Sequence, residues 1–164
     1  MRTEKQEKMI EYLKTVRKVQ SGMGTRNTQF PFISIEDYLL KNGKFFRTDL
    51  SIKVHRGEMK ECFMNAQRLA QTKGYRYVEG YAAGIIPTLH AWVINEHDIV
   101  IDPTWNDDEA VYFGVVIPMA YVLKVNLLRK AYGVLDAWEI GWPLLKGTHK
   151  LSDYDERSTF LYQP

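Results

Sequence analysis

Cys62, His90 and Asp102 are the residues of this sequence whose types could together support thiol-based chemistry. A cysteine thiolate attacks a carbonyl carbon, a histidine takes up and returns the proton, and a carboxylate orients the imidazole ring. Each residue also has an ordinary interpretation when taken alone: a small buried hydrophobe, a core histidine, and a turn residue before Pro103. We therefore expect a catalytic triad only if the surrounding elements bring the three side chains together.

Cys62 begins a predicted helix over residues 62–72, CFMNAQRLAQT, which ends at Lys73-Gly74. Unpaired amides and the positive end of the dipole in the first turn of a helix stabilise a thiolate. The carboxylate of Glu61 opposes this effect unless its side chain points away. The buried stripe of this helix is predicted to consist of Phe63, Ala66, Leu69 and Ala70.

His90 and Asp102 lie in two neighbouring predicted strands, LHAWVI at 89–94 and DIVIDPTW at 98–105. In an antiparallel hairpin they face each other if the connection has an odd number of residues, so we predict an odd-length turn or a bulge here. An even turn would send Asp102 to the other face of the sheet. Among the remaining histidines, His55 is the second-choice base because it lies close to Cys62 in the sequence, whereas His97 and His149 fall in predicted loops or turns.

The hairpin connection is predicted to comprise residues 94–98 or 95–97. A direct pairing of His90 with Asp102 sets Trp92 opposite Val100 and Val93 opposite Ile99. A three-residue loop commonly needs one left-handed residue, and the sequence offers Asn95 or His97 for it.

The remaining patterns predict one α+β domain over residues 1–164, with helices first and an antiparallel strand cluster after them. An amphipathic helix is expected at 4–20, with Met9 and Leu13 on its apolar stripe. A short helix in SIEDYLLKNG is flanked by Ser34, with Asp37 three residues on, and by Asn42-Gly43. Further elements are a strand at 75–82, an apolar strand or buried extended stretch at 111–117, a helix at 119–132, and a polar tail at 146–164 in which Phe160, Leu161 and Tyr162 are the anchoring residues.

The composition and charge of the chain argue against several classes of protein. A formal net charge of +2 gives no basic face for nucleic acid, and no apolar run is long enough to span a bilayer. The N-terminal stretch is charged throughout, so we do not expect a secretory signal. The single cysteine excludes an internal disulfide and two-cysteine metal motifs. We expect a cytoplasmic protein without metal, cofactor, nucleic-acid partner or membrane partner.

Four blocks in the middle of the chain resemble the transglutaminase-like core of the papain-like cysteine peptidase superfamily. They are ECFMNAQRLA, YRYVEGYA, LHAWVI and VIDPTW, in this order across residues 61–105. The resemblance implies a nucleophile-bearing helix packed on an antiparallel sheet or half-barrel, with Cys62, His90 and Asp102 as a triad. It also implies acyl chemistry: Cys62 attacks an amide or ester carbonyl to give a thioester, and water or an amine then takes the acyl group.

The sequence departs from this family around the nucleophile, where MKECF replaces the frequent Gly and Trp neighbours. The oxyanion hole is therefore unassigned beyond the backbone N–H of Cys62. Asn65 or His55 is a tentative second donor, although Asn65 could equally be a polar residue of the helix surface. Trp92 and Trp105 flank the site in the sequence, and core packing is favoured over substrate contact for both.

We favour hydrolysis of a protein, peptide or small amide by a cysteine hydrolase or peptidase. Crosslinking needs a site that excludes water and admits an amine, and nothing in the chain demonstrates one. The alternatives are an acyl transferase, crosslinking or deamidating enzyme on the same triad, an inactive ligand- or peptide-binding module, and an adaptor acting through helix 4–20. The loops at 82–88 and 106–114 are expected to shape the cleft, where Asp107, Asp108 and Glu109 either favour a cationic substrate group or are simply solvated.

Overall fold

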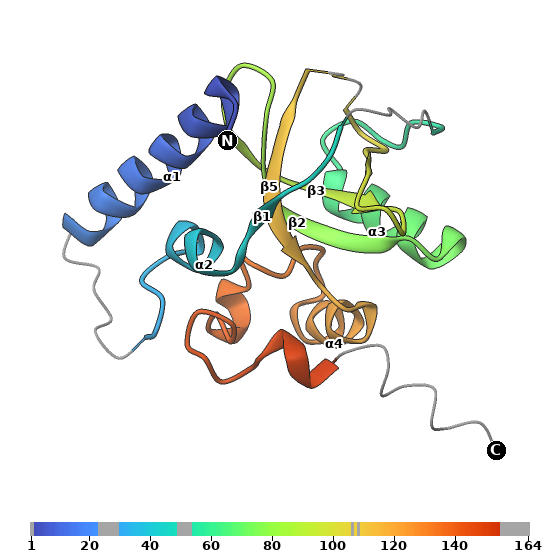
Figure 1. Cartoon of the computed structure of the whole chain (residues 1–164). Helices are drawn as coiled ribbons and strands as arrows, with labels where there is room; N and C mark the ends of the chain where they lie inside the picture. The colour runs from blue at the N-terminus through green and yellow to red at the C-terminus, as the bar shows by residue number, and fades with distance from the viewer. Residues whose placement is uncertain (1, 23–29, 49–53, 106, 108, 155–164) are drawn as a thin grey trace.

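The computed structural model describes residues 2–22, 30–48, 54–105, 107 and 109–154. Within them, two helices precede most of the sheet, one helix carries Cys62, and a fourth follows the last strand (Figure 1). The helices are α1 (Glu4–Gly22), α2 (Ile35–Asn42), α3 (Cys62–Lys73) and α4 (Met119–Arg129), with short 3-10 turns at Trp138–Ile140 (η1) and Leu151–Tyr154 (η2). The strands are β1 (Lys44–Phe45), β2 (Arg76–Ala83), β3 (Thr88–Ile94), β4 (Val100–Ile101) and β5 (Val111–Val116).

The five described strands form one sheet in the order β1-β5-β2-β3-β4, and each neighbouring pair is antiparallel. The sheet curves so strongly that its two edges approach each other. Arg47, just after β1, bridges to Ile99, just before β4, and its carbonyl accepts a hydrogen bond of 2.8 Å from the Val100 amide. The predicted α+β class is confirmed, and the sheet is an antiparallel half-barrel.

Two glycines permit this curvature. Gly80 on β2 lies directly opposite Gly114 on β5, and a Cβ atom at Gly80 would collide with the Phe113 carbonyl of the neighbouring strand. A Cβ atom at Gly114 would lie 2.8 Å from the Trp92 indole. Without side chains at these points, the two strands cross closely and leave room for Trp92.

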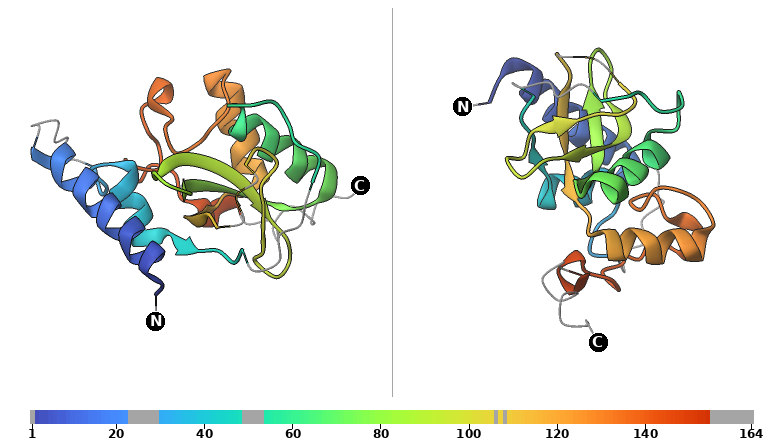
Figure 2. Two further views of the ribbon diagram at one scale, coloured as in Figure 1. Left: turned by 90° about the horizontal axis from the view of Figure 1, so that it is seen from above. Right: turned by 90° about the vertical axis from the view of Figure 1, so that its right-hand side faces the viewer.

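Side-chain alternation divides the sheet between two cores. Val78, Ala82, Trp92 and Ile94 point into the curve, where they pack with Phe46, Val100, Ala110 and Tyr112. Tyr77, Tyr81, Ala91 and Val93 point outward and pack against the helices. On this outer side, α1 and α2 lie together at one end of the molecule and α3 lies at the other, as Figure 2 shows from above.

The helix predictions are close to the observed boundaries. The Ser34 hydroxyl accepts a hydrogen bond of 3.1 Å from the Asp37 amide at the start of α2, and α3 ends at a left-handed Gly74. The helix predicted at 119–132 ends earlier, because Lys130 adopts the left-handed conformation. The stripe predicted for α3 is partly wrong: Ala66 and Ala70 are buried, but Phe63 and Leu69 are only half-buried while Asn65 and Gln67 are buried.

The connection between β3 and β4 has an odd number of residues, as predicted, but the register of the two strands differs from the predicted one. Ile94 pairs with Val100 and Val93 with Ile101, so residues 95–99 connect the strands and the predicted pairs are wrong by two positions. The left-handed residue is Asp98, with φ of 60°, rather than Asn95 or His97. The Asn95 carboxamide oxygen instead accepts the amides of His97 and Ile99, and thereby organises the turn.

The C-terminal part of the chain is described as far as Tyr154, so the anchoring residues predicted at 160–162 lie outside the described residues. Asp108, predicted in the acidic loop, lies outside them as well. In the described ranges, none of the helices combines the length and the apolar character that crossing a membrane requires.

Candidate active site

Cys62 is the first residue of α3, as predicted, and its side chain is largely buried, with the residue 9% exposed. The preceding residue, Glu61, makes no side-chain hydrogen bond to the end of the helix, and the first turn contains no acidic residue. The amides of this turn are therefore not capped by Glu61, and their positive partial charge lies beside the sulfur. The backbone N–H of Cys62 is the natural first donor for an oxyanion formed there.

His90 connects the sulfur to the carboxylate. It lies on β3 and is 2% exposed, and its Nε2 atom is 2.7 Å from Asp102 Oδ2. The Cys62 side chain also lies close enough to the imidazole to raise its pKa. Because Asp102 takes Nε2, the nitrogen available to the sulfur is Nδ1. The structure therefore brings together all three residues predicted for the triad.

These contacts control the protonation of His90. Burial lowers the pKa of the imidazole, but the hydrogen bonds to Asp102 and Cys62 and the charges of both groups together outweigh burial. The result is a pKa raised from 6.5 to about 9. At neutral pH the ring therefore carries a proton and presents a positive charge beside the sulfur.

Asp102 follows β4 and uses its two carboxylate oxygens differently. Oδ1 accepts the backbone amides of Thr104 and Trp105 at 2.8 and 2.9 Å, which forms the turn after Pro103. Oδ2 accepts from His90 and from the Tyr112 hydroxyl, the latter at 2.9 Å. Asp102 thus forms the turn and also contacts His90, although the two residues are not directly opposite each other in the pairing of β3 with β4.

Tyr112 is a residue of the site that the sequence did not reveal. It lies on β5 and is 3% exposed, and it reaches Asp102 across the interior of the curved sheet. Its position depends on the pairing of β5 with β2, two strands separated along the chain by β3 and β4. No local pattern around YFG carries that information.

The two predicted tryptophans have different positions. Trp105 is half-buried and stacks on the His90 ring, with 4.3 Å between ring centroids and an interplanar angle of 24°. Trp92 is fully buried inside the half-barrel and contacts Phe46 and Tyr112. Core packing is therefore confirmed for Trp92, while Trp105 packs against the face of the His90 imidazole.

Asn65 connects α3 to the turn that begins at Asp102. Its side-chain amide donates to the Glu58 carbonyl at 2.7 Å and to the Thr104 hydroxyl at 3.0 Å. These two bonds use both amide hydrogens, which favours a structural role for Asn65, whereas its role as an oxyanion donor stays a prediction. His55 lies exposed in the segment 54–61, which crosses the same turn through a Gly57 amide bond to the Pro103 carbonyl.

The predicted cleft loops lie next to each other. Both loops are shorter than predicted, because β2 extends to Ala83, β3 begins at Thr88 and β5 begins at Val111. A Cβ atom at Gly84, between β2 and β3, would collide with the Asp107 carboxylate, which precedes β5. Glu109 forms an ion pair with Lys5 of α1, with 2.8 Å between Oε2 and Nζ. Part of the acidic character of this loop is therefore already compensated within the chain. Among the described residues, no group of three His, Cys, Asp or Glu side chains is arranged to hold a metal ion.

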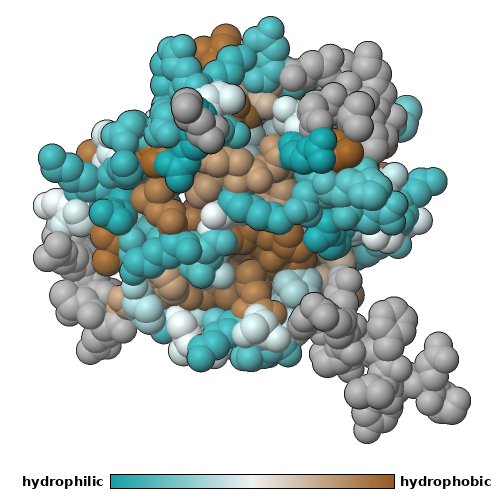
Figure 3. All heavy atoms as spheres, viewed as in Figure 1, coloured by the Kyte–Doolittle hydropathy of each residue, from teal (hydrophilic) through white to brown (hydrophobic). Residues whose placement is uncertain are grey.

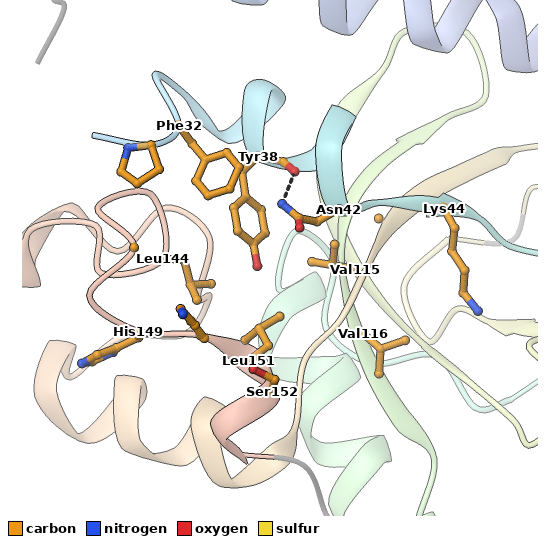
Figure 4. Close-up of a pocket in the computed structure, with 14 residues that line it drawn as sticks. Phe32, Tyr38, Asn42, Lys44, Val115, Val116, Leu144, His149, Leu151 and Ser152 are labelled. Atoms are coloured by element: carbon orange, nitrogen blue, oxygen red, sulfur yellow. Dashed lines mark hydrogen bonds between the residues drawn. The ribbon is translucent and has the colours of Figure 1, made fainter. Parts of the chain in front are cut away.

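The cavity shown in Figure 4 is separate from the triad. It has a volume of about 580 Å³ and lies between α2, β5 and residues 144–152, with apolar side chains such as Phe32, Val115 and Leu151 on its walls. Figure 3 shows hydrophobic side chains gathered across the middle of the same side of the molecule. None of the residues that line the cavity is Cys62, His90 or Asp102.

Comparisons with protein-family models, with curated proteins and with solved structures each found no match to this chain. The case for the site therefore depends on its own geometry.

Proposed function

We propose that this protein is a thiol-dependent amide hydrolase that uses Cys62, His90 and Asp102. One observation carries the proposal: the buried His90 ring hydrogen-bonds the Asp102 carboxylate and lies close enough to the cysteine that begins α3 for that cysteine to raise its pKa. A structural histidine needs only partners for its nitrogens, whereas this arrangement puts a nucleophile, a proton carrier and an orienting group in series. The resemblance of residues 61–105 to the transglutaminase-like core supports the same reaction class.

The cycle begins with attack of the Cys62 sulfur on the carbonyl carbon of the substrate. The carbonyl oxygen gains negative charge beside the first-turn amides of α3. The carbon–nitrogen bond then breaks, the leaving amine takes the proton from His90, and a thioester remains on the sulfur. His90 next accepts a proton from water, whose oxygen attacks the thioester carbon. The carbon–sulfur bond breaks, the acid is released, and the thiolate–imidazolium pair is restored.

The first test is the rate of alkylation of the thiol by iodoacetamide near neutral pH. Cys62 is the only cysteine, so the modified mass reports one sulfur. We expect fast alkylation of the wild type and at least about a tenfold lower rate for His90→Ala, which loses the imidazolium partner. His97→Ala is the matched control, because His97 lies in the exposed turn between β3 and β4. Equal rates for wild type and His90→Ala would rule out an activated thiol.

The second test identifies the reaction. Wild type and Cys62→Ala are incubated with a cell lysate, and mass spectrometry compares the products. New peptide or amide cleavage sites in the wild-type sample only are the expected result. Deamidated or crosslinked products without cleavage would replace hydrolysis by transfer on the same triad. Identical product profiles, together with slow alkylation that does not depend on His90, would leave a binding module rather than an enzyme.

A further inference from the structure

The cavity of about 580 Å³ shown in Figure 4 has the volume of a small-molecule binding site. It lies between α2, β5 and the segment 144–152, away from the triad. Apolar side chains form much of its wall, among them Phe32, Val115, Leu144 and Leu151. Such a wall can cover the hydrophobic body of a ligand.

The hydroxyl group of Tyr38 points into this cavity. The residue is 7% exposed, and Figure 4 shows its hydroxyl oxygen directed into the space between Leu144, Val115 and Leu151. Within the described ranges, this oxygen has no hydrogen-bond partner. It is also not one of the unpartnered atoms that are sealed off from solvent, so a molecule in the cavity can reach it. Because buried hydroxyls are normally hydrogen-bonded, this one calls for a partner from outside the chain.

Neighbouring residues hold Tyr38 in this orientation. The Phe32 ring packs against it edge to face, with 4.9 Å between ring centroids and an interplanar angle of 75°. The Asn42 carboxamide donates a hydrogen bond of 2.9 Å to the Tyr38 carbonyl, which is the dashed line in Figure 4. Burial raises the pKa of the Tyr38 hydroxyl, so the group keeps its proton at neutral pH and can donate it to an acceptor.

The charge around the cavity favours an anionic acceptor. Lys44 and Lys150 line the wall, and none of the described lining residues is an aspartate or a glutamate. The Lys44 ammonium group is paired with Asp98 and points away from the centre of the cavity in Figure 4. Lys150 forms no ion pair with a described residue. His149 is uncharged at neutral pH, because burial lowers its pKa. Lys150 thus supplies a positive charge that the wall itself does not compensate.

We propose that this cavity binds a small organic carboxylate with an apolar body. The Tyr38 hydroxyl donates to a carboxylate oxygen, Lys150 attracts the negative charge, and the apolar wall covers the body. An ammonium ligand fits poorly, because it would meet basic residues and no lining carboxylate. Binding here does not require the reaction at Cys62, since no residue of the triad lines the cavity.

The test is calorimetric titration of the full chain with 4-phenylbutyrate at pH 7. Two ligands with the same body, 4-phenylbutan-1-ol and 4-phenylbutylammonium, are the controls for charge. We expect the alcohol to bind at least about tenfold more weakly than the carboxylate, and the ammonium ion more weakly still, because a charged acceptor strengthens the hydrogen bond. Tyr38→Phe removes only the hydroxyl and should weaken carboxylate binding by about tenfold. Lys150→Met should weaken it by about threefold, because this lysine is exposed.

Tyr132→Phe and Lys73→Met are the matched control variants. Both residues are exposed, and neither lines this cavity, so both variants should bind 4-phenylbutyrate like the wild type. Thermal unfolding checks that each variant is folded. If Tyr38→Phe does not fold, the order of the three ligands and the comparison of Lys150→Met with Lys73→Met still decide the question.

Three results would overturn the proposal. The first is equal binding of carboxylate, alcohol and ammonium ion, and the second is equal binding of 4-phenylbutyrate by wild type and folded Tyr38→Phe. The third is binding of a peptide with a C-terminal phenylalanine without binding of 4-phenylbutyrate, which would favour a protein partner. Alkylation of Cys62 locates the ligand independently: saturating 4-phenylbutyrate should leave its rate unchanged. Protection of Cys62 together with binding that does not depend on Tyr38 would place the carboxylate at the triad instead.

Discussion

At the scale of single residues, Asp102 contributes both to a turn of the fold and to the candidate active site. One carboxylate oxygen holds the turn that follows β4, and the other holds the imidazole. A substitution of Asp102 therefore disturbs both functions at once. Tyr112 touches only the oxygen that faces His90, so it offers a selective way to perturb the triad. In the proposed mechanism, Tyr112 acts through the Asp102 carboxylate and is therefore a positioning residue rather than a catalytic one.

Tyr112→Phe should raise the pKa of His90. Without the hydroxyl, Oδ2 of Asp102 has His90 as its remaining triad partner, and the less compensated carboxylate stabilises the imidazolium more strongly. NMR titration of labelled histidine, with His90 assigned through His90→Gln, measures the change. Tyr121→Phe is the control, since this buried tyrosine binds His149 instead. A His90 titration midpoint that is the same in wild type and Tyr112→Phe would contradict the positioning role.

The raised pKa of His90 also predicts a pH dependence of stability. A group whose pKa is higher in the folded state stabilises the protein fully below its unfolded pKa, here 6.5. The contribution disappears as the pH rises to about 9. The free energy of unfolding from urea titrations should therefore fall between pH 6.5 and 9, by on the order of 3 kcal/mol. His90→Gln should flatten this slope, and His97→Gln should leave it intact; a slope that survives in His90→Gln would assign it to other groups.

At the scale of elements, the site depends on how α3 is fixed to the turn after β4. The segment 54–61 crosses that turn, and Asn65 ties both to the helix through bonds to Glu58 and Thr104. Gly57 is necessary at this crossing, because a Cβ atom there would collide with the Asn65 side chain. The position of Cys62 relative to His90 therefore depends on a carboxamide rather than on the sheet alone.

Asn65→Ala should lower the free energy of unfolding by about 2–3 kcal/mol. The substitution removes two hydrogen bonds at a residue that is 5% exposed and leaves the Glu58 carbonyl and Thr104 hydroxyl without this donor. Urea unfolding gives the change. The comparison variant is Asn42→Ala, where an exposed asparagine donates one bond to the Tyr38 carbonyl and a loss of at most about 1 kcal/mol is expected. Equal losses in the two variants would show that Asn65 is an ordinary helix residue.

At the scale of the whole molecule, local sequence patterns predicted most helices and strands, whereas strand pairing in the sheet determines how they are arranged in space. Helix ends were predictable because Ser34, through its hydroxyl, and Gly74, through its amide, make hydrogen bonds to residues three or four positions away. The predicted triad came together because strand parity survives a shift of two residues in register. Asp102 reaches His90 from beyond the end of β4, which the sequence had assigned to a longer strand.

Several features that sequence reasoning missed depend on pairing between distant segments. β1 has only two residues, and its place in the sheet comes from β5 and from the Arg47 bridge to Ile99. Tyr112 acquires its role because β5 lies beside β2. The α3 stripe was misjudged because Asn65 and Gln67 are buried by polar partners, Thr104 and Tyr77, that lie on other elements. The spacing of hydrophobic residues along the sequence does not reveal such contacts.

The apolar side of α1 is part of the hydrophobic core, which argues against the alternative that this helix acts as an adaptor through its apolar stripe. Met9, Ile10 and Leu13 of α1 belong to the same hydrophobic cluster as Ala66 of α3 and Val122 of α4. Leu13 is fully buried. Leu13→Ala should therefore lower the free energy of unfolding by about 2–5 kcal/mol through the cavity it creates, whereas Val19→Ala, at a residue 56% exposed, should change it by less than about 0.5 kcal/mol.

Urea unfolding of both variants measures the difference. Alkylation of Cys62 in the folded Leu13→Ala protein should keep its wild-type rate, because none of the described hydrogen bonds joins α1 to Cys62, His90 or Asp102. A negligible change in stability for Leu13→Ala would mean that the helix is dispensable for the core and would favour a separate, partner-binding role. A large loss ties α1 to the domain, and any partner would then have to bind its charged outer face rather than its apolar stripe.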